Sequence, residues 1–278
     1  MNDWMTVIYT TDMESAHFVL ECKKKGKICV SAVDARSAFY MATGICAQNH
    51  CKVAVCVDGG NASRSAFSGM TEAFYRKLPV ALITIGRKLN YTKELNDVIV
   101  NHHIANSNAE VMKLMDNDFP IHIELIEETI KQKQIKCYEL QQILSSELEK
   151  DDYLYISQGI ERENCLYSGK VVYGGMLGCY DGALANILGA SLARLHKKYI
   201  GLISEEELVH DLNTLGNINI NDLFSLVVVG KKKNSTLADY ASALQFEVKV
   251  AKEDQITENE IKSVCQSNKK TILMVYKE

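Results

Sequence analysis

The stretches VDARSAFYMATGICAQ (33–48) and KVAVCVDGGNASRSAFSGMTEAFYRKLPVALITIG (52–86) decide the fold of the first half of this chain. The first is a run of helix-forming residues that begins after a short apolar segment. The second contains a β-branched run that ends at Asp58-Gly59-Gly60, a helix-like segment from about Ser63, and another β-branched run. This order of strand, glycine turn, helix and strand is typical of a parallel α/β unit.

The same alternation continues outward along the whole chain. Further short apolar runs occur at TVIYTT, KICVSAV, PIHIEL, DYLYIS, KYIGLIS, LFSLVVVG and KTILMVY. At 278 residues, the chain is long enough for two domains. Residues 128–150 contain neither Gly nor Pro. We therefore predict two similar α/β domains, 1–127 and 151–278, each a mostly parallel sheet flanked by helices, with a helical linker at 128–150.

The composition limits the binding partners and the cellular compartment that we expect. Hydrophobic residues make up 47% of the chain and charged residues 24%, with a net charge of -4. This balance predicts a soluble globular protein and argues against nucleic acid as a partner. The nine cysteines form no CxxC pair, which favours reduced thiols. The chain shows neither a signal peptide nor an apolar run of membrane-spanning length, so we expect a cytoplasmic protein without membrane contact.

The turn after the third apolar run has the residues of a phosphate-binding loop. Gly59, Gly60 and Asn61 precede a helix, and glycines let a backbone approach a ligand at a helix N-terminus. Every α/β protein needs such turns, so the spacing alone also fits an ordinary strand-to-helix connection.

Taken together, several segments resemble the pyrimidine-binding and diphosphate-binding domains of thiamine-diphosphate enzymes such as acetolactate synthases, pyruvate decarboxylases and the carboligase of menaquinone synthesis. The similar segments of the first half are DARSAFYMATGICA, DGGNASRSAFSGMTEA, KLPVALITIG and PIHIEL, and those of the second half are SGKVVYGGMLGCYDGALANILGASLA, KKYIGLISEEELVHDLNTLGNINI and LFSLVVVGKKKN. The middle domain of most members is missing, as in sulfopyruvate and phosphonopyruvate decarboxylases. The resemblance implies thiamine diphosphate and Mg²⁺ as cofactors, and a homodimer that builds its sites between chains.

In the first domain, the resemblance assigns three candidate catalytic residues. The family's cofactor-activating glutamate aligns with Ala35, which cannot transfer a proton. Asp34 is a possible substitute, although it also suits a helix N-cap. His102 and His103 resemble a histidine pair that contacts intermediates in pyruvate decarboxylases, but an ordinary surface or interface pair is the alternative.

In the second domain, the resemblance assigns the remaining contacts of the cofactor. Gly178, Cys179 and Tyr180 are similar to the loop that holds the aminopyrimidine, and Glu205 replaces the aspartate that binds Mg²⁺. Lys231 stands where the family has metal-binding asparagines and would contact the diphosphate as a point charge. The alternatives are a helix start rich in carboxylates and a solvated loop.

Two functions follow from the matches and the replacements. One is a 2-oxo acid decarboxylase or carboligase that uses thiamine diphosphate. The other is a catalytically retired structural or regulatory subunit of a related enzyme. The combined loss of the glutamate and of the metal pattern favours the second hypothesis.

Overall fold

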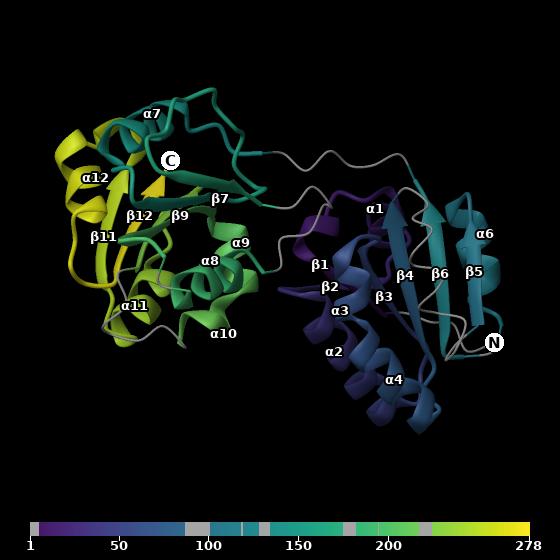
Figure 1. Ribbon diagram of the computed structural model, residues 1–278. Coiled ribbons are helices and arrows are strands. Elements are labelled where there is room, and N and C mark those ends of the chain that lie inside the picture. The colour runs from purple at the N-terminus through teal and green to yellow at the C-terminus, as the bar shows by residue number, and fades with distance from the viewer. Residues whose placement is uncertain are drawn as a thin grey trace. The chain divides into compact units, whose positions relative to one another are not determined.

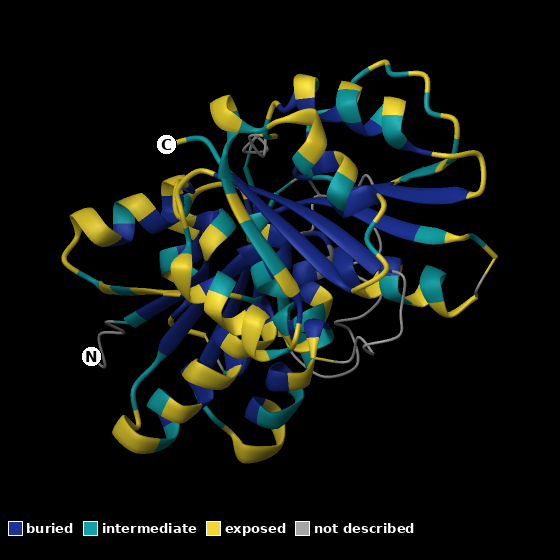
Figure 2. Cartoon of the chain, turned by 90° about the vertical axis from the view of Figure 1, so that its left-hand side faces the viewer, coloured by how far each residue is buried: buried dark blue, intermediate teal, exposed yellow. Residues whose placement is uncertain are grey.

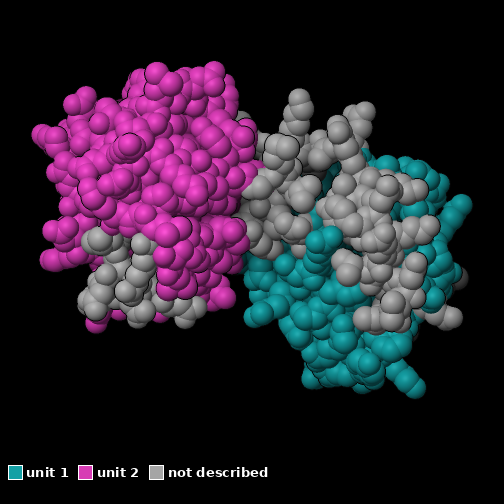
Figure 3. Space-filling view, in the orientation of Figure 1, with its two compact units in different colours: residues 1–132, 177–179 teal, residues 133–176, 180–278 magenta. Residues whose placement is uncertain are grey.

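The computed structural model describes residues 6–86, 101–117, 119–127, 134–174, 182–193, 195–216 and 224–278. These residues form two compact units, one up to residue 127 and one from residue 134 (Figure 3). Each unit holds one six-stranded sheet with helices packed on it (Figure 1). This confirms the predicted α/β class with two similar domains.

Unit 1 contains a fully parallel sheet in the order β2-β1-β3-β4-β6-β5. Its strands are β1 (Thr6–Thr10), β2 (Ile28–Ala32), β3 (Val53–Asp58), β4 (Val80–Gly86), β5 (Asn101–Ala105) and β6 (Ile121–Ile126). Its described helices are η1 (Thr11–Met13), α1 (His17–Lys24), α2 (Ala35–Asn49), α3 (Asn61–Ser65), α4 (Phe67–Arg76) and α6 (Asn108–Leu114).

Unit 2 repeats this topology in the order β11-β12-β10-β9-β7-β8, again with parallel pairs. Its strands are β7 (Asp152–Ile156), β8 (Lys170–Tyr173), β9 (Lys198–Ser204), β10 (Phe224–Gly230), β11 (Glu247–Lys252) and β12 (Thr271–Tyr276). Its described helices are α7 (Tyr138–Glu147), α8 (Ala183–Leu192), α9 (Glu205–His210), α10 (Leu212–Leu215), α11 (Ser235–Ala243), η2 (Glu253–Gln255) and α12 (Glu258–Cys265). Strand for strand, β7 corresponds to β1 and β9 to β3, so α8 is the counterpart of α2.

Both faces of each sheet are buried, which explains the continuous apolar runs in the sequence. In unit 1, one core joins the sheet to α1 and α6, and a second core joins it to α2 and α4. Figure 2 shows the central strands buried and the outer faces of many helices exposed. The helices α2 and α4 approach closely because Gly69 leaves room for the ring of Phe39, which is fully buried.

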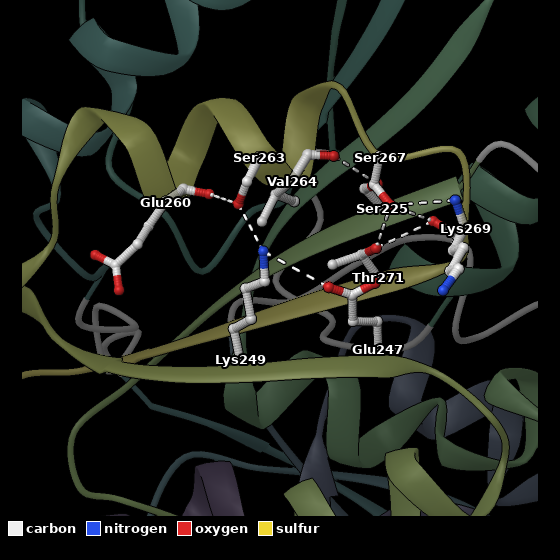
Figure 4. Close-up of polar contacts among 9 residues, drawn as sticks. All are labelled: Ser225, Glu247, Lys249, Glu260, Ser263, Val264, Ser267, Lys269 and Thr271. Atoms are coloured by element: carbon white, nitrogen blue, oxygen red, sulfur yellow. Dashed lines mark hydrogen bonds and ion pairs between the residues drawn. The ribbon is translucent and has the colours of Figure 1, made fainter.

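The outer strand β11 of unit 2 is tied to α12 by polar side chains (Figure 4). The Nζ atom of Lys249 donates to Ser263 Oγ at 2.7 Å and lies 3.7 Å from Glu247 Oε1. At the end of the same helix, Ser225 Oγ donates to the carbonyl of Val264 at 3.1 Å. Charges on an edge strand also discourage pairing with another sheet.

The described part of the expected linker belongs to unit 2. Helix α7 buries Leu140 and Leu144 in the core that also contains Leu154 and Ile156 of β7. Residues 134–150 therefore cover one face of the second sheet. No helix in the described ranges is long and apolar enough to cross a membrane.

We expect Gly69→Ala to destabilise unit 1. An added Cβ would lie 2.7 Å from the Cβ atom of Phe39, so one helix must shift. Such overpacking costs about 1 to 3 kcal/mol of unfolding free energy. Urea unfolding measures the loss, with the exposed neighbour Ser68→Ala as control. An unchanged urea midpoint in Gly69→Ala would show that the contact between α2 and α4 is not tight.

Candidate functional site

The topology predicts one position in each unit, called the crevice below, where a ligand would bind. In open parallel sheets, ligands bind at the carboxyl ends of strands where the connections turn to opposite sides. In unit 1 this point lies between β1 and β3, because β2 and β3 flank β1 on opposite sides. In unit 2 the equivalent point lies between β7 and β9. The predicted turn at Gly59-Gly60 and the predicted metal residue Glu205 both lie at these edges.

In unit 1, the glycine turn is closed by hydrogen bonds within the chain. The N–H of Gly60 donates to Asp58 Oδ2 at 2.7 Å, and the N–H of Gly59 donates to the carbonyl of Ile85 at 2.9 Å. Asn61 is the first residue of α3. Both glycine N–H groups that a phosphate would use are therefore already donated.

The carboxyl group of Asp58, at the end of β3, has a strongly raised pKa. Burial raises the pKa of Asp58 to about 7, the Gly60 N–H opposes that rise, and the negative charge of Asp12 adds to it. Asp12 lies in η1, directly after β1, so the acids stand on both sides of the crevice. A second negative charge from a bound phosphate would be repelled here, whereas a proton is retained near neutral pH.

Asp34 acts as the N-cap of α2. Its Oδ1 accepts from the Ser37 N–H at 2.8 Å and its Oδ2 from Ser37 Oγ at 2.7 Å. The next residue, Ala35, is 1% exposed and packs between α2 and the sheet. Both carboxylate oxygens of Asp34 therefore serve the helix start, and Ala35 lies in the core.

The two predicted histidines lie on β5 but point to opposite faces of the sheet, as neighbours in a strand do. His102 Nε2 lies 3.4 Å from Glu124 Oε2, and the His102 and His122 ring centroids are 4.9 Å apart. The structure thus joins His102, and not His103, to a buried polar cluster. That cluster also contains Thr84.

His122 is the fully buried centre of this cluster. Its Nε2 atom lies 2.8 Å from Thr84 Oγ1, and its side chain has no exposed surface. Burial lowers the pKa of His122 to about 3, and nearby His102 adds to the effect. Thr84 and Glu124 are not among the residues predicted from sequence. The alternation in PIHIEL, which puts His122 and Glu124 on one face, was the available signal.

In unit 2, a buried carboxylate lies at the carboxyl ends of β7 and β9, the predicted crevice. Glu207 is 1% exposed, and its Oε1 accepts from the N–H of Gly159 at 3.1 Å. Its Oε2 accepts from Ser204 Oγ at 2.7 Å, from the Ser204 N–H at 3.2 Å, and from Ser157 Oγ. Four donors at the carboxyl ends of β7 and β9 therefore converge on one side chain. Glu207 is not among the residues predicted from sequence, although Ser204-x-x-Glu207 is a capping-box pattern.

Glu205, the predicted metal ligand, and Lys231, the predicted diphosphate contact, each contact another side chain of unit 2. Glu205 Oε1 accepts from Asn234 Nδ2 at 2.6 Å, and Lys231 Nζ lies 3.4 Å from Glu206 Oε1. These contacts link the turn after β9 to the turn after β10. Within the described ranges, no group of three His, Cys, Asp or Glu side chains is arranged to hold a metal ion. The predicted residues Gly178, Cys179 and Tyr180 lie outside the described residues.

We expect Glu207→Ala to destabilise unit 2, because it leaves the buried donors of Ser157, Gly159 and Ser204 without their acceptor. The expected loss of unfolding free energy is on the order of 3 kcal/mol. The control Glu206→Ala breaks only the exposed pair with Lys231 and should cost less than about 1 kcal/mol. Urea unfolding of both variants compares the two losses, and equal losses would contradict the central role of Glu207.

We expect His122 to make the protein sensitive to acid. Its folded pKa of about 3 lies below the unfolded value of about 6.5, so the unfolded chain binds the extra proton between these values. The contribution of His122 is complete above about pH 6.5 and falls as pH decreases toward 3, by at most about 1.4 kcal/mol per pH unit.

Unfolding free energies of wild type and His122→Asn between pH 4 and 7 isolate this effect, with the exposed His50→Asn as control. The difference between wild type and His122→Asn should change with pH, and a constant difference would contradict the assignment.

Comparisons with known proteins come from sequence and from structure. No family model matches the chain. The 2-succinyl-5-enolpyruvyl-6-hydroxy-3-cyclohexene-1-carboxylate synthase of Flavobacterium johnsoniae is 30% identical over 112 residues. This match covers 38% of the chain but only 20% of the synthase. The matched segment therefore spans only about a fifth of that curated relative.

Two decarboxylases illustrate the similar solved structures. Benzoylformate decarboxylase from Polynucleobacter necessarius aligns with 99% of this chain and 96% of its own, at a TM-score of 0.37 and 8% identity. The thiamine diphosphate-dependent 4-hydroxybenzoylformate decarboxylase of Rhodococcus jostii RHA1 aligns with 100% of this chain and 97% of its own, at the same TM-score and identity.

Proposed function

We propose that this chain is a thiamine-diphosphate-fold protein that no longer performs the cofactor's chemistry and serves as a structural or regulatory subunit of a related enzyme. One observation carries the proposal: the buried carboxylate of Glu207 accepts four hydrogen bonds at the crevice of unit 2. A diphosphate bound at this edge would compete with that carboxylate for the same donors.

The surroundings of Glu207 also disfavour a diphosphate and its Mg²⁺. Glu205, Glu206 and Glu207 form the first turn of α9, so they already neutralise the positive end of the helix. Glu205 is held by Asn234 and Lys231 lies beside Glu206, so neither predicted contact is directed only toward a ligand. The described residues of unit 2 therefore do not fit the group.

Unit 1, which resembles the pyrimidine-binding domain, also lacks the residues that would activate the cofactor. Formation of the reactive ylide needs an acid that can exchange a proton with the cofactor's pyrimidine ring. Ala35 is buried, and both oxygens of Asp34 are engaged by Ser37. This supports the loss of cofactor activation, independently of unit 2.

The raised pKa of Asp58 favours the second candidate function, a 2-oxo acid decarboxylase or carboligase. Its pKa of about 7 is suited to proton transfer near neutral pH. It also lies at the carboxyl end of β3, in the crevice of unit 1. In this alternative, Asp58 rather than Asp34 or a histidine would exchange the proton.

A binding and exchange experiment separates the two candidates. Calorimetry with thiamine diphosphate and Mg²⁺ should show no saturable binding to the native chain at millimolar cofactor. NMR should show exchange of the cofactor's C2 proton for deuterium no faster than in buffer. Tight binding with faster exchange would overturn the subunit proposal, and loss of that exchange in Asp58→Asn would establish the alternative.

Enzyme kinetics test the proposed regulatory role. We expect the purified chain to change the kcat or KM of a complete thiamine-diphosphate decarboxylase or carboligase from the same organism. The same concentration of an unrelated globular protein controls for a nonspecific effect of added protein. An unchanged rate with every such enzyme would contradict a regulatory role.

A further inference from the structure

Strand β2 is an outer strand of unit 1 that carries exposed apolar side chains. Among the described residues it pairs with β1, at the end of the sheet order. Ile28 and Val30, which alternate onto one face of the strand, are 56% and 37% exposed, and Val33, just beyond the strand, is 42% exposed. An outer strand presents backbone N–H and C=O groups on the side away from its neighbour. Strand β2 therefore offers both hydrogen-bonding groups and apolar side chains at the margin of the sheet.

The other outer strands of the two described sheets carry charged or imidazole side chains, which β2 lacks. Strand β11 contains Glu247, Lys249 and Lys252. Strand β8 begins with Lys170, and β5 contains two adjacent histidines. Charged residues on an outer strand discourage pairing with another chain. The sequence of β2, ICVSA, contains no such residue. Of the described outer strands, β2 therefore opposes the addition of another strand least.

Lysines stand at the amino end of β2. Residues 21–30, which end α1 and begin β2, contain four lysines and one acid, Glu21. Lys25 Nζ lies 2.5 Å from Glu21 Oε1, and Lys27 directly precedes β2. The whole chain, by contrast, has a net charge of -4. The amino end of β2 is therefore locally positive in a negative chain, and it attracts negatively charged segments within about 10 Å.

We propose that β2 is the docking site of an extended acidic segment of another protein, which adds a strand to the sheet of unit 1. Main-chain hydrogen bonds to β2 supply the affinity, as in other cases of strand addition. Apolar side chains of the segment cover Ile28 and Val30 as cross-strand neighbours. Acidic residues at one end of the segment contact Lys25 and Lys27. A bound helix could use the lysines, but it would leave the backbone groups of β2 unused.

This docking site is separate from both predicted crevices. The crevices lie at the carboxyl ends of strands, whereas Lys27 and Ile28 stand at the amino end of β2. Binding of a segment at β2 therefore neither needs nor prevents a ligand at a crevice. A failure of the segment to bind would leave the proposed loss of cofactor chemistry untouched, and the reverse also holds.

Fluorescence anisotropy with three labelled synthetic peptides tests the site. The first peptide alternates threonine and valine between two glutamates at each end, so that either strand direction places acids beside Lys25 and Lys27. The second has lysines in place of the glutamates, and the third has prolines in place of the valines. We expect saturable binding of the first, and binding at least about 10-fold weaker of the second, which loses the charge contacts, and of the third, which cannot pair as a strand. Equal binding of the first and third peptides would overturn strand addition.

Variants of the chain locate the binding at β2. Val30→Glu should weaken binding of the acidic peptide at least about 10-fold, because it places a like charge beside the added strand. The matched control is Val250→Glu on β11, a valine 39% exposed against 37% for Val30, and it should bind as the native chain does. Circular dichroism checks the folding of each variant.

A second variant keeps the test decisive if Val30→Glu does not fold. Lys27→Glu should weaken binding of the acidic peptide and strengthen binding of the lysine peptide, while Lys252→Glu on β11 should change neither. Absence of saturable binding to the native chain, or equal losses in Val30→Glu and Val250→Glu, would overturn the proposal. A native dimer that excludes the peptide and dissociates in Val30→Glu would also overturn it, because β2 would then pair with a second copy.

Discussion

The buried carboxylate of Glu207 holds together the carboxyl ends of β7 and β9 in unit 2, because it accepts four hydrogen bonds there. A buried charge is tolerated only when donors surround it. The carboxyl ends of β7 and β9 provide them through Ser157, Gly159 and Ser204. Because the same contacts cap α9, the strands, the helix start and the charge stabilise one another. The carboxyl ends of β7 and β9, where the topology predicts a ligand site, are consequently part of the folded core.

In unit 1, the carboxyl end of the equivalent strand also holds an acidic side chain, but its surroundings differ from those of Glu207. Asp58 occupies the carboxyl end of β3, the counterpart of β9, and accepts from the N–H of Gly60. Unlike Glu207, it faces a second acid, Asp12, and its pKa rises to about 7. One crevice is therefore held by a satisfied charge and the other by a group that titrates near neutral pH. Any remaining ligand chemistry is better supported in unit 1.

Local pattern was sufficient to predict the class of fold, but not the partners of the site residues. Short β-branched runs and glycine turns indicated two parallel sheets, because buried parallel strands have few alternatives in sequence. The N-cap role of Asp34 followed equally from its position before a helix. The contact of His102 with Glu124 depends on the pairing of β5 with β6, which no local pattern fixes. Glu207 was missed because the family alignment drew attention to Glu205, two residues earlier.

The repeated topology allows the strand ends of the two units to be compared directly. In a protein whose crevice binds a ligand, selection on the edge residues preserves free donors and charges for it. Here the edge residues Glu205, Asn234 and Asp58 contact other groups of the chain. Because both edges use these polar groups within the fold, a ligand at either edge would have to displace hydrogen bonds that the chain already makes.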